Sequence, residues 1–394
     1  MSAPKNLPLK NWDQMSKKIK ILFAINQMAI GGSQKFFIDK INMMNRDIFD
    51  PHILTLIPEG DRSFFEDINL PQEKIVFIHL KSYLDISSWF KIVQFVKKER
   101  FDIVFSTLIL ANTVVRIAAL LAGVRNILIS EDNVYPDKKK IYFLADRALS
   151  LVTKKILAVS YVTRAFLVGV GKIAPHRIRV TYAGIDPALF EAARRRRDNN
   201  RKKLGFDDDE IVIISVGRIS VQKGYDMLLD TAKVLRETEA SKLRFVIIGK
   251  DDTELGAELK KKATDSGIDD VVEFWGIHKN VPELMAASDI FFLPSRWEGF
   301  CIVLAEAMAA GIPFVASDVG FVSREDRKHN GIKDGECGFI VGDYKPGLFA
   351  DKISELIKSP SLRQGMGYRG SIKAKDLSIE KSIRRFEKIC LELA

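Results

Sequence analysis

The sequence predicts an α/β protein with two parallel sheets, each covered by helices on both faces. Short apolar runs alternate with helical patterns along the 394 residues, and this alternation is typical of parallel sheets with right-handed crossovers. The pattern occurs twice, on either side of a charged run at 194–203. The length and the hydrophobic content of 47% also suffice for about two domains with separate cores.

The first half begins with a strand at 20–26, a loop containing Gly31 and Gly32, and a helical pattern. Glycine would let backbone approach a ligand there, although a double glycine after a strand is equally typical of an ordinary turn. Further strands are predicted at 52–57, 74–78, 102–106, 126–130, 156–159 and 177–182. We expect the chain to cross between domains at 184–190, so the first domain comprises residues 1–186.

The second half repeats the scheme and predicts a domain over residues 187–375. Its strands are expected at 211–216, 244–249, 271–274, 289–293 and 313–316, and helices at 225–236, 254–266 and 281–287. One more amphipathic helix is predicted at 378–393. We expect this last segment, 376–394, to cross back to the first domain.

Composition indicates a cytoplasmic protein. Residues 1–18 are polar and lack the apolar core of a signal peptide, and apolar runs such as 117–124 are far shorter than the ~20 residues that span a bilayer. The three cysteines, Cys301, Cys337 and Cys390, are scattered without metal-ligand spacing, which fits a reducing compartment. Acidic clusters at 207–209 and 251–252 are interpreted as solvated loops or helix caps, and no metal site is expected.

Positive charge is concentrated in the first half. Residues 1–185 contain 27 Lys and Arg against 16 Asp and Glu, whereas the remainder contains 34 against 35. This asymmetry suggests an anionic partner for the first half, such as a membrane surface or a phosphorylated acceptor, and not nucleic acid. Segments 89–98 and 138–144 combine cations with aromatic residues, so they either lie in a membrane interface or pack on the sheet with their lysines in water.

The most informative stretch is 294–308. A buried strand ends at Pro294, Gly299 permits a tight turn, and a helix is predicted at 302–310. Such a junction lies at the carboxyl end of a parallel sheet, where a helix N-terminus favours anions. Glu298 and Glu306 flank that position. A ligand with phosphates and hydroxyls, such as a nucleotide sugar, would suit it.

A second motif runs from Gly217 to Gly224 and also joins a strand to a helix. It places Arg218 and Lys223 at the same sheet edge as Glu298. Two cations there can hold a diphosphate and stabilise it as it departs. The alternative is a turn with a solvated Arg and Lys.

Together these motifs resemble the retaining glycosyltransferases of family 4, which have the GT-B fold of two Rossmann-like domains facing across a cleft. The matching residues are Gly217-Arg218, Lys223-Gly224, residues 272–276, Pro294-Ser295, Glu298-Gly299-Phe300, Glu306-Ala307 and Ala316-Ser317-Asp318. Weaker matches in the first half are Gly31-Gly32, Val159-Ser160 and Gly184-Ile185-Asp186.

The resemblance implies a donor bound mainly to the second domain and an acceptor bound to the first. Glu306 would contact the ribose, and Glu298 would lie near the transferred sugar and the diphosphate. Glu298, Arg218 and Lys223 are the catalytic candidates, and no metal or cofactor is required. The other donor-binding candidates are Gly31, Gly32, Gly217, Gly276, Ile277, Gly299, Phe300, Cys301 and Ile302. The donor nucleotide is expected to be UDP or GDP.

The acceptor side departs from the family pattern. Where the family often has a histidine, this chain has Ser130-Glu131-Asp132-Asn133, so Glu131 and Asn133 are candidate acceptor contacts. Cys301 stands where the family often has a small residue. It is interpreted as a packing thiol, because no base is arranged to activate it.

The leading hypothesis is a retaining, metal-independent hexosyltransferase that moves a sugar from a nucleoside diphosphate to a hydroxyl acceptor. We expect it to act in cell-surface glycan, polysaccharide or glycolipid synthesis, with a lipid-linked acceptor and a peripheral position on the cytoplasmic face of a membrane. A nucleotide-sugar epimerase of the same fold and a non-catalytic scaffold that binds nucleotide sugar or anionic lipid are the alternatives.

Overall fold

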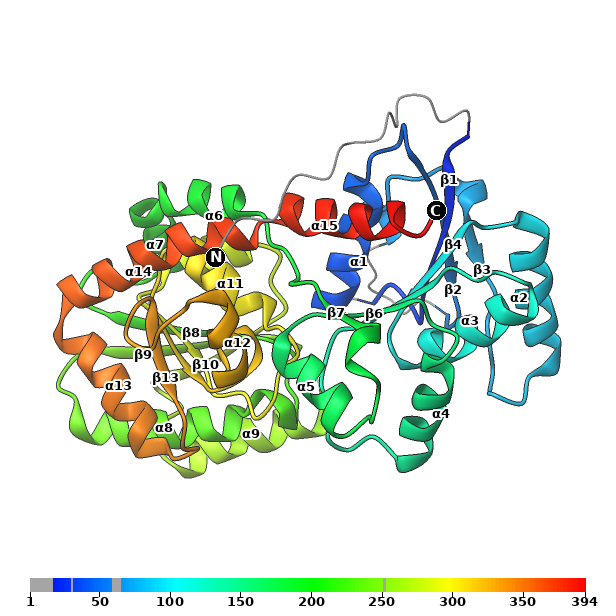
Figure 1. The fold of residues 1–394 in the computed structure, drawn as a ribbon. Coiled ribbons are helices and arrows are strands. Elements are labelled where there is room, and N and C mark those ends of the chain that lie inside the picture. Colours follow the sequence, from blue (N-terminus) through cyan, green and yellow to red (C-terminus); the bar gives the residue numbers. More distant parts are fainter. Residues whose placement is uncertain (1–16, 30, 59–64, 251–252) are drawn as a thin grey trace.

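The computed structural model describes residues 17–29, 31–58, 65–250 and 253–394. It contains two parallel sheets, one in each lobe of the molecule (Figure 1). The predicted α/β architecture of the GT-B type is confirmed. The acidic pair at 251–252 lies outside the described residues.

The first sheet has the strand order β3-β2-β1-β4-β5-β6-β7. Its strands are β1 (Ile19–Ile25), β2 (Phe49–Thr55), β3 (Ile75–Phe77), β4 (Ile103–Thr107), β5 (Ile127–Glu131), β6 (Lys155–Ala158) and β7 (Ile178–Val180). The helices of this half are α1 (Gly32–Met43), α2 (Ile86–Glu99), α3 (Ile109–Leu121), α4 (Lys140–Ser150) and α5 (Tyr161–Gly169). Successive side chains of β1 enter different cores: Phe23 packs with α1, whereas Leu22 packs with α2 and α3.

The second sheet has the order β10-β9-β8-β11-β12-β13. Its strands are β8 (Ile211–Val216), β9 (Leu243–Ile248), β10 (Val272–Gly276), β11 (Ile290–Leu293), β12 (Phe314–Ser317) and β13 (Gly338–Val341). Its helices are α6 (Pro187–Arg194), α7 (Arg197–Leu204), α8 (Tyr225–Thr238), α9 (Glu254–Asp265), α10 (Val281–Ala287), α11 (Ile302–Ala310), α12 (Arg324–Asn330), α13 (Pro346–Lys358) and α14 (Pro360–Ala374). Short 3-10 helices include η5 (Val221–Lys223) and η6 (Gly320–Val322).

The charged run at 194–203 forms the end of α6 and most of α7, which the sequence interpretation did not identify as helices. Its arginines are structural: Arg197 and Arg201 pair with Asp289 at 2.7 and 3.1 Å, and Arg201 also donates to the carbonyl of Ala287 at 2.9 Å. Because arginine contacts replace apolar ones, the run lacks the hydrophobic period that predicts a helix. Strand β13 was also missed, since it is a short edge strand.

The chain passes between the two lobes twice, and the two passages run side by side. Ile185 donates from its N–H to the carbonyl of Leu377 at 3.0 Å and accepts from the N–H of Ile379 at 2.7 Å. The final helix α15 (Ile379–Leu391) then lies against α1, red beside blue in Figure 1. Its Phe386 ring is 4.9 Å from that of Phe105, in the core of the first sheet. We therefore propose domain boundaries at residues 186 and 375.

Candidate active site

The loop between β11 and α11 is buried against the first domain. Backbone contact requires glycine at 299, because a Cβ there would lie 2.1 Å from the carbonyl oxygen of Asp132. The next residue, Phe300, is buried and stacks on Phe321 at 4.8 Å. The predicted strand, loop and helix are therefore present, and the loop touches the segment that carries the acceptor candidates.

Cys301 begins α11 in a left-handed conformation, with φ of 77°. Non-glycine residues adopt this region at a cost of roughly 1 kcal/mol or more. The thiol packs in the core of the second domain, and burial raises its pKa. A neutral, packed thiol fits the predicted structural role and not that of a nucleophile.

Glu298 forms a buried ion pair with Lys223. Its Oε1 accepts from Lys223 Nζ at 2.7 Å and from Ser295 Oγ at 2.8 Å, while Gln222 Nε2 donates to Oε2 at 3.3 Å. Burial by itself would lower the pKa of Lys223, but the Glu298 carboxylate outweighs it and holds that pKa above its ordinary value. Lys223 is therefore charged at neutral pH, and the two glycine-flanked motifs meet through this pair.

Glu306, on the second turn of α11, differs from Glu298 because no described residue pairs with its partly buried carboxylate. Burial raises its pKa to about 7, and the charge of Lys35 on α1 opposes that rise. The carboxylate has its full capacity to accept hydrogen bonds from a ligand.

Arg218 is exposed, and its guanidinium has no partner among the described residues. Burial raises the pKa of Tyr135 in the first domain, and Arg218 is the cation that opposes this rise, so Arg218 faces that domain. Gly217 precedes it and provides room for Lys223, whose Cε would lie 2.9 Å from a Cβ at 217. Two cations thus lie at the carboxyl end of β8, one paired and one free.

Two helix N-termini meet between the domains. Helix α1 begins at Gly32, and a Cβ there would lie 3.2 Å from Cδ1 of Ile302, the first residue of α11. The preceding Gly31 is extended, with φ of 178°. The first N–H groups of both helices have no acceptor within their own helix, and both dipoles place positive potential here. An anion would be favoured between them.

The remaining donor candidates lie farther along the same edge. Gly276 ends β10 with φ of 68°, and Ile277 is 38% exposed. Strand β9 lies between β10 and β8, and no described contact joins these two residues to Glu298. The structure places them at the predicted edge but does not bring them to the ion pair.

The acceptor candidates occupy different environments. Glu131 is buried at the end of β5, where Asn112 Nδ2 donates to it at 3.2 Å. Burial and the nearby Asp146 raise its pKa to about 7, against the opposing charges of Lys138 and Arg116. Both of those cations pair with Asp146.

Asn133 is half-buried and reaches across the interface, where its Nδ2 donates to Gln222 Oε1 at 3.4 Å. Gln222 in turn donates to the carbonyl of Trp297 at 3.0 Å and to Glu298. The acceptor-side loop and Glu298 are therefore joined through one amide side chain. The sequence gives no signal for Gln222 beyond its place next to Lys223.

Asp326 is another residue that sequence reasoning missed. This buried carboxylate of α12 accepts from the backbone N–H groups of Tyr161 and Val162 at the start of α5, each at 2.8 Å. Tyr182 donates its hydroxyl to the same group at 3.0 Å. The spacing of Ser323 and Asp326 is a capping signal, but it points to α12 itself. The contact that it makes with the other domain depends on tertiary packing.

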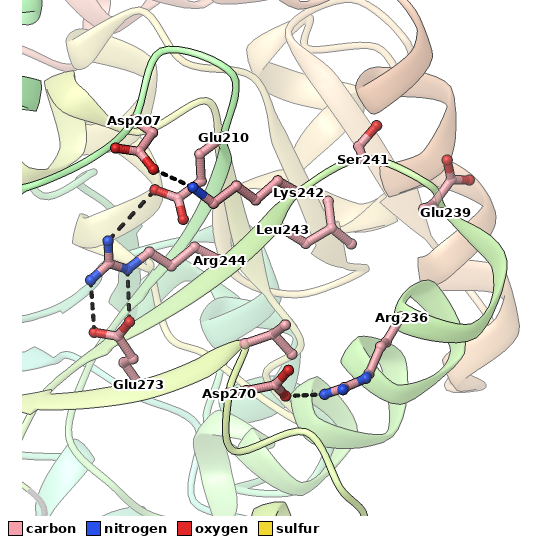
Figure 2. A pocket seen from close by; sticks show the side chains of 11 residues that line it. Asp207, Glu210, Arg236, Glu239, Ser241, Lys242, Leu243, Arg244, Asp270 and Glu273 are labelled. Atoms are coloured by element: carbon pink, nitrogen blue, oxygen red, sulfur yellow. Dashed lines mark hydrogen bonds and ion pairs between the residues drawn. The ribbon is translucent and has the colours of Figure 1, made fainter.

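A hollow of about 480 Å³ lies at the opposite edge of the second sheet. Figure 2 shows its charged side chains facing one another, with Arg244 between Glu210 and Glu273 and Lys242 on Asp207. Its three cations are all engaged in ion pairs with acids of the same hollow. The hollow lies at the amino ends of the strands, away from the carboxyl edge that carries Glu298, so it is not the candidate site. Among the described residues, no group of three or more His, Cys, Asp or Glu is placed to hold a metal ion.

Models of known protein families match both halves of the chain. Residues 30–189 match the model described as Glycosyltransferase Family 4, and residues 196–372 match Glycosyl transferases group 1. The two matches together cover most of the chain. The chain belongs to glycosyltransferase family 4. The predicted family is thus confirmed, and its second-domain match contains Arg218, Lys223, Glu298 and Glu306.

Individual relatives of this family 4 glycosyltransferase are distant. An uncharacterized 41.2 kDa protein in the cps region of Klebsiella pneumoniae is 30% identical over 57% of each chain, less than two thirds of that relative's length. An Escherichia coli UDP-Gal:alpha-D-GlcNAc-diphosphoundecaprenol alpha-1,3-galactosyltransferase is 25% identical over 77% of this chain and 80% of its own. The fold of HepE from Anabaena, solved with UDP-glucose, superposes with a TM-score of 0.80 at 19% identity, covering 95% of this chain and 99% of HepE.

Proposed function

We propose that this chain transfers a hexosyl group from a nucleoside diphosphate sugar to a hydroxyl acceptor, with retention of configuration. The observation that carries the proposal is the partly buried carboxylate of Glu306, which has no partner in the described part of the chain and lies on the helix whose N-terminus faces α1. A carboxylate that accepts two hydrogen bonds suits the vicinal hydroxyls of a ribose. The adjacent pair of helix N-termini suits the diphosphate attached to that ribose.

The second-domain cations would stabilise the leaving group. The guanidinium of Arg218 has no partner among the residues that the structure describes, and Lys223 is held in place by Glu298 at 2.7 Å. As the bond to the sugar breaks, negative charge develops on the diphosphate, and these preorganised cations and helix N-termini lower its energy. We expect transfer to continue in EDTA, because these groups do the work that a metal ion would otherwise do.

Retention follows if the acceptor attacks the face that the diphosphate leaves. The departing phosphate oxygen can then take the acceptor proton, and no side chain needs to act as a classical base. Glu298 lies beside Lys223 and next to Gly299, which contacts the acceptor-side loop. We assign Glu298 to the transferred sugar, with Asn133 and Glu131 on the acceptor side.

For the donor we propose a UDP sugar. HepE was solved with UDP-glucose, and the Escherichia coli relative is named for UDP-Gal. A thermal-shift comparison of UDP, GDP, ADP and dTDP tests this, since a ligand that binds the folded state raises the melting temperature. A larger shift with GDP, ADP or dTDP than with UDP would contradict the assignment.

For the acceptor we propose a lipid-linked saccharide in cell-surface polysaccharide synthesis, used at the cytoplasmic face of a membrane. The support is the diphosphoundecaprenol acceptor in the name of the Escherichia coli relative and the cps region of the Klebsiella protein. The basic first half fits an anionic surface or a phosphorylated acceptor. No helix among the described residues is long and apolar enough to cross a bilayer.

The decisive trial measures sugar transfer and donor hydrolysis by Glu298→Ala, Glu306→Ala and Lys223→Ala. We expect all three to lose most activity, and unchanged rates in all three would refute the site. Incubation of the donor without acceptor is the companion experiment. Isomerisation of the sugar would show an epimerase and contradict the transferase.

A further inference from the structure

An exposed apolar surface joins the start of α2 to α4. We call it the α2–α4 patch, and its apolar members are Tyr83, Leu84, Ile86, Phe90, Ile141 and Leu144. Leu84 is 87% exposed and Ile86 81%, while Ile141 and Leu144 are 65% and 62% exposed. The ring centroids of Tyr83 and Tyr142 are 6.4 Å apart, so the segment that leads into α2 approaches α4 at this pair. Monomeric proteins seldom leave a group of large apolar side chains exposed without a partner.

Helices α2 and α4 both pack on the first domain through buried side chains, so the exposure of the apolar side chains does not result from loose packing. Helix α2 is capped by Asp85 and buries Ile92 and Val96 in the core. Helix α4 directs Asp146 inward, where it pairs with Arg116 and Lys138. The outward face of α4 therefore carries apolar side chains, while the inward-facing Asp146 already has its ion-pair partners.

Exposed cations lie close in sequence to the residues of the patch. They are Lys81, Lys91, Lys139, Lys140 and Arg147, all exposed, and none forms an ion pair within the described part of the chain. Of the neighbouring acids, Asp85 is engaged as the α2 cap and Asp137 is exposed. Exposed apolar side chains on helices that also carry exposed cations fit the boundary between lipid headgroups and acyl chains.

We propose that the α2–α4 patch binds an anionic membrane surface, with its apolar side chains in the headgroup region and its cations on lipid phosphates. Charge complementarity favours lipid over a protein partner, since the exposed cations near the patch match the phosphates of an anionic bilayer. Of the two segments that combine cations with aromatic residues, 138–144 is thus assigned to the membrane interface. The rest of the patch consists of the residues that precede α2 and those of its first turns.

Helix α4 connects the patch to the candidate acceptor site. Asp146 of α4 contacts Arg116 and Lys138, and its charge acts on Glu131 at the end of β5. A membrane-bound protein would therefore hold its acceptor side near the lipid. This link to a lipid-linked acceptor rests on the proposed function, whereas the binding of lipid does not.

Sedimentation with vesicles tests the inference without any substrate. The full chain should bind vesicles of phosphatidylcholine mixed with an equal amount of phosphatidylglycerol at low salt, and should bind neither pure phosphatidylcholine nor the mixed vesicles at high salt. We expect the double variant Ile141→Glu/Leu144→Glu to bind the mixed vesicles at least about tenfold more weakly, and Lys139→Glu/Lys140→Glu to do the same.

The matched control is Tyr368→Glu/Ile372→Glu on α14 of the second domain, where the two side chains are 63% and 48% exposed. It adds the same charge outside the patch and should bind like the unaltered chain. Absence of binding to mixed vesicles at low salt, or equal binding by the patch variants and the control, would overturn the proposal. Failure here leaves transfer to a water-soluble acceptor unaffected, so the two proposals fail separately.

Discussion

Two sheet edges face each other in this molecule, and each carries a buried glutamate at or just after the end of a strand. In the second domain, Glu298 contacts Lys223, Gln222 and Ser295, which come from two short segments. In the first domain, the surroundings of Glu131 come from α3, α4 and the loop between β5 and α4. The edge that we propose for the donor is thus built from local motifs, whereas the edge that we propose for the acceptor is assembled by packing.

The electrostatics differ as well. Glu298 is matched by a cation at 2.7 Å, while the pKa values of Glu131 and Glu306 are both raised to about 7 by burial. One acid is fixed by an ion pair and two can change charge near neutrality. This difference predicts which substitutions change the fold and which change the pH dependence of binding.

The largest effect is expected from Lys223→Ala, which leaves the Glu298 charge buried and unpaired. The free energy of unfolding should fall by about 3 kcal/mol, and transfer should fall at least about a hundredfold. Denaturant unfolding and steady-state rates measure the two. The control is Arg296→Ala, whose pair with Asp226 is near the surface and should contribute less than about 1 kcal/mol. Equal losses in both variants would mean that the Glu298 pair has no special role.

A smaller effect is expected from Glu306→Gln, which keeps the shape and removes the charge. Donor affinity should fall about ten- to a hundredfold, the range for a hydrogen bond to a charged group. In the unaltered protein, donor affinity should rise between pH 6 and pH 8 as the carboxylate ionises around its pKa of about 7. The variant should lack that rise.

Glu131→Gln should instead change the KM for acceptor, and a change in donor affinity would contradict the division between the edges.

The same two acids affect stability with a defined sign. Their folded-state pKa values lie above the ordinary glutamate value of 4.5, so the folded state binds protons more tightly than the unfolded state. The free energy of unfolding that the tighter proton binding contributes is fully present below about pH 4.5 and is lost as pH rises through about 7. Each Gln variant should flatten this part of the stability curve, as measured by denaturant unfolding at several pH values.

The smallest effect is expected from Cys301→Gly. Glycine removes the strain of φ at 77° but also removes a packed thiol, so the net change in stability should be within about 1 kcal/mol. Cys301→Ala keeps the strain and should be the less stable of the two. Transfer should remain within about twofold in both, and a large loss in both would assign the thiol a chemical role.

The comparison also explains what could be predicted from sequence. Strand and helix alternation predicted the two sheets, because buried parallel strands have an apolar signature over a few residues. The proposed donor edge could be identified because Arg218, Lys223, Glu298 and Glu306 lie in two motifs with short internal spacing, and the structure joins the two motifs through the pair of Lys223 and Glu298. Both signals are local, so no knowledge of packing was needed.

The acceptor edge could not be predicted in the same way. The pairing of Arg116 with Asp146 spans 30 residues, and the contact between Asp326 and the start of α5 spans about 165. Asn133 was identified, but its partner Gln222 lies 89 residues away. These contacts exist only after the helices have packed, and no spacing rule in a single sequence contains them.

The last helix also determines when the first domain can be completed. Phe386, Ile389 and Cys390 fill the core between β1, β4 and α1, yet the chain has made the whole second sheet before it reaches them. At about 5–20 residues per second, the ribosome needs roughly ten to forty seconds to cover that stretch. During this time the α1 face of the first sheet lacks its cover. The two domains therefore cannot mature as independent units in order of synthesis, and the first one made is the last one finished.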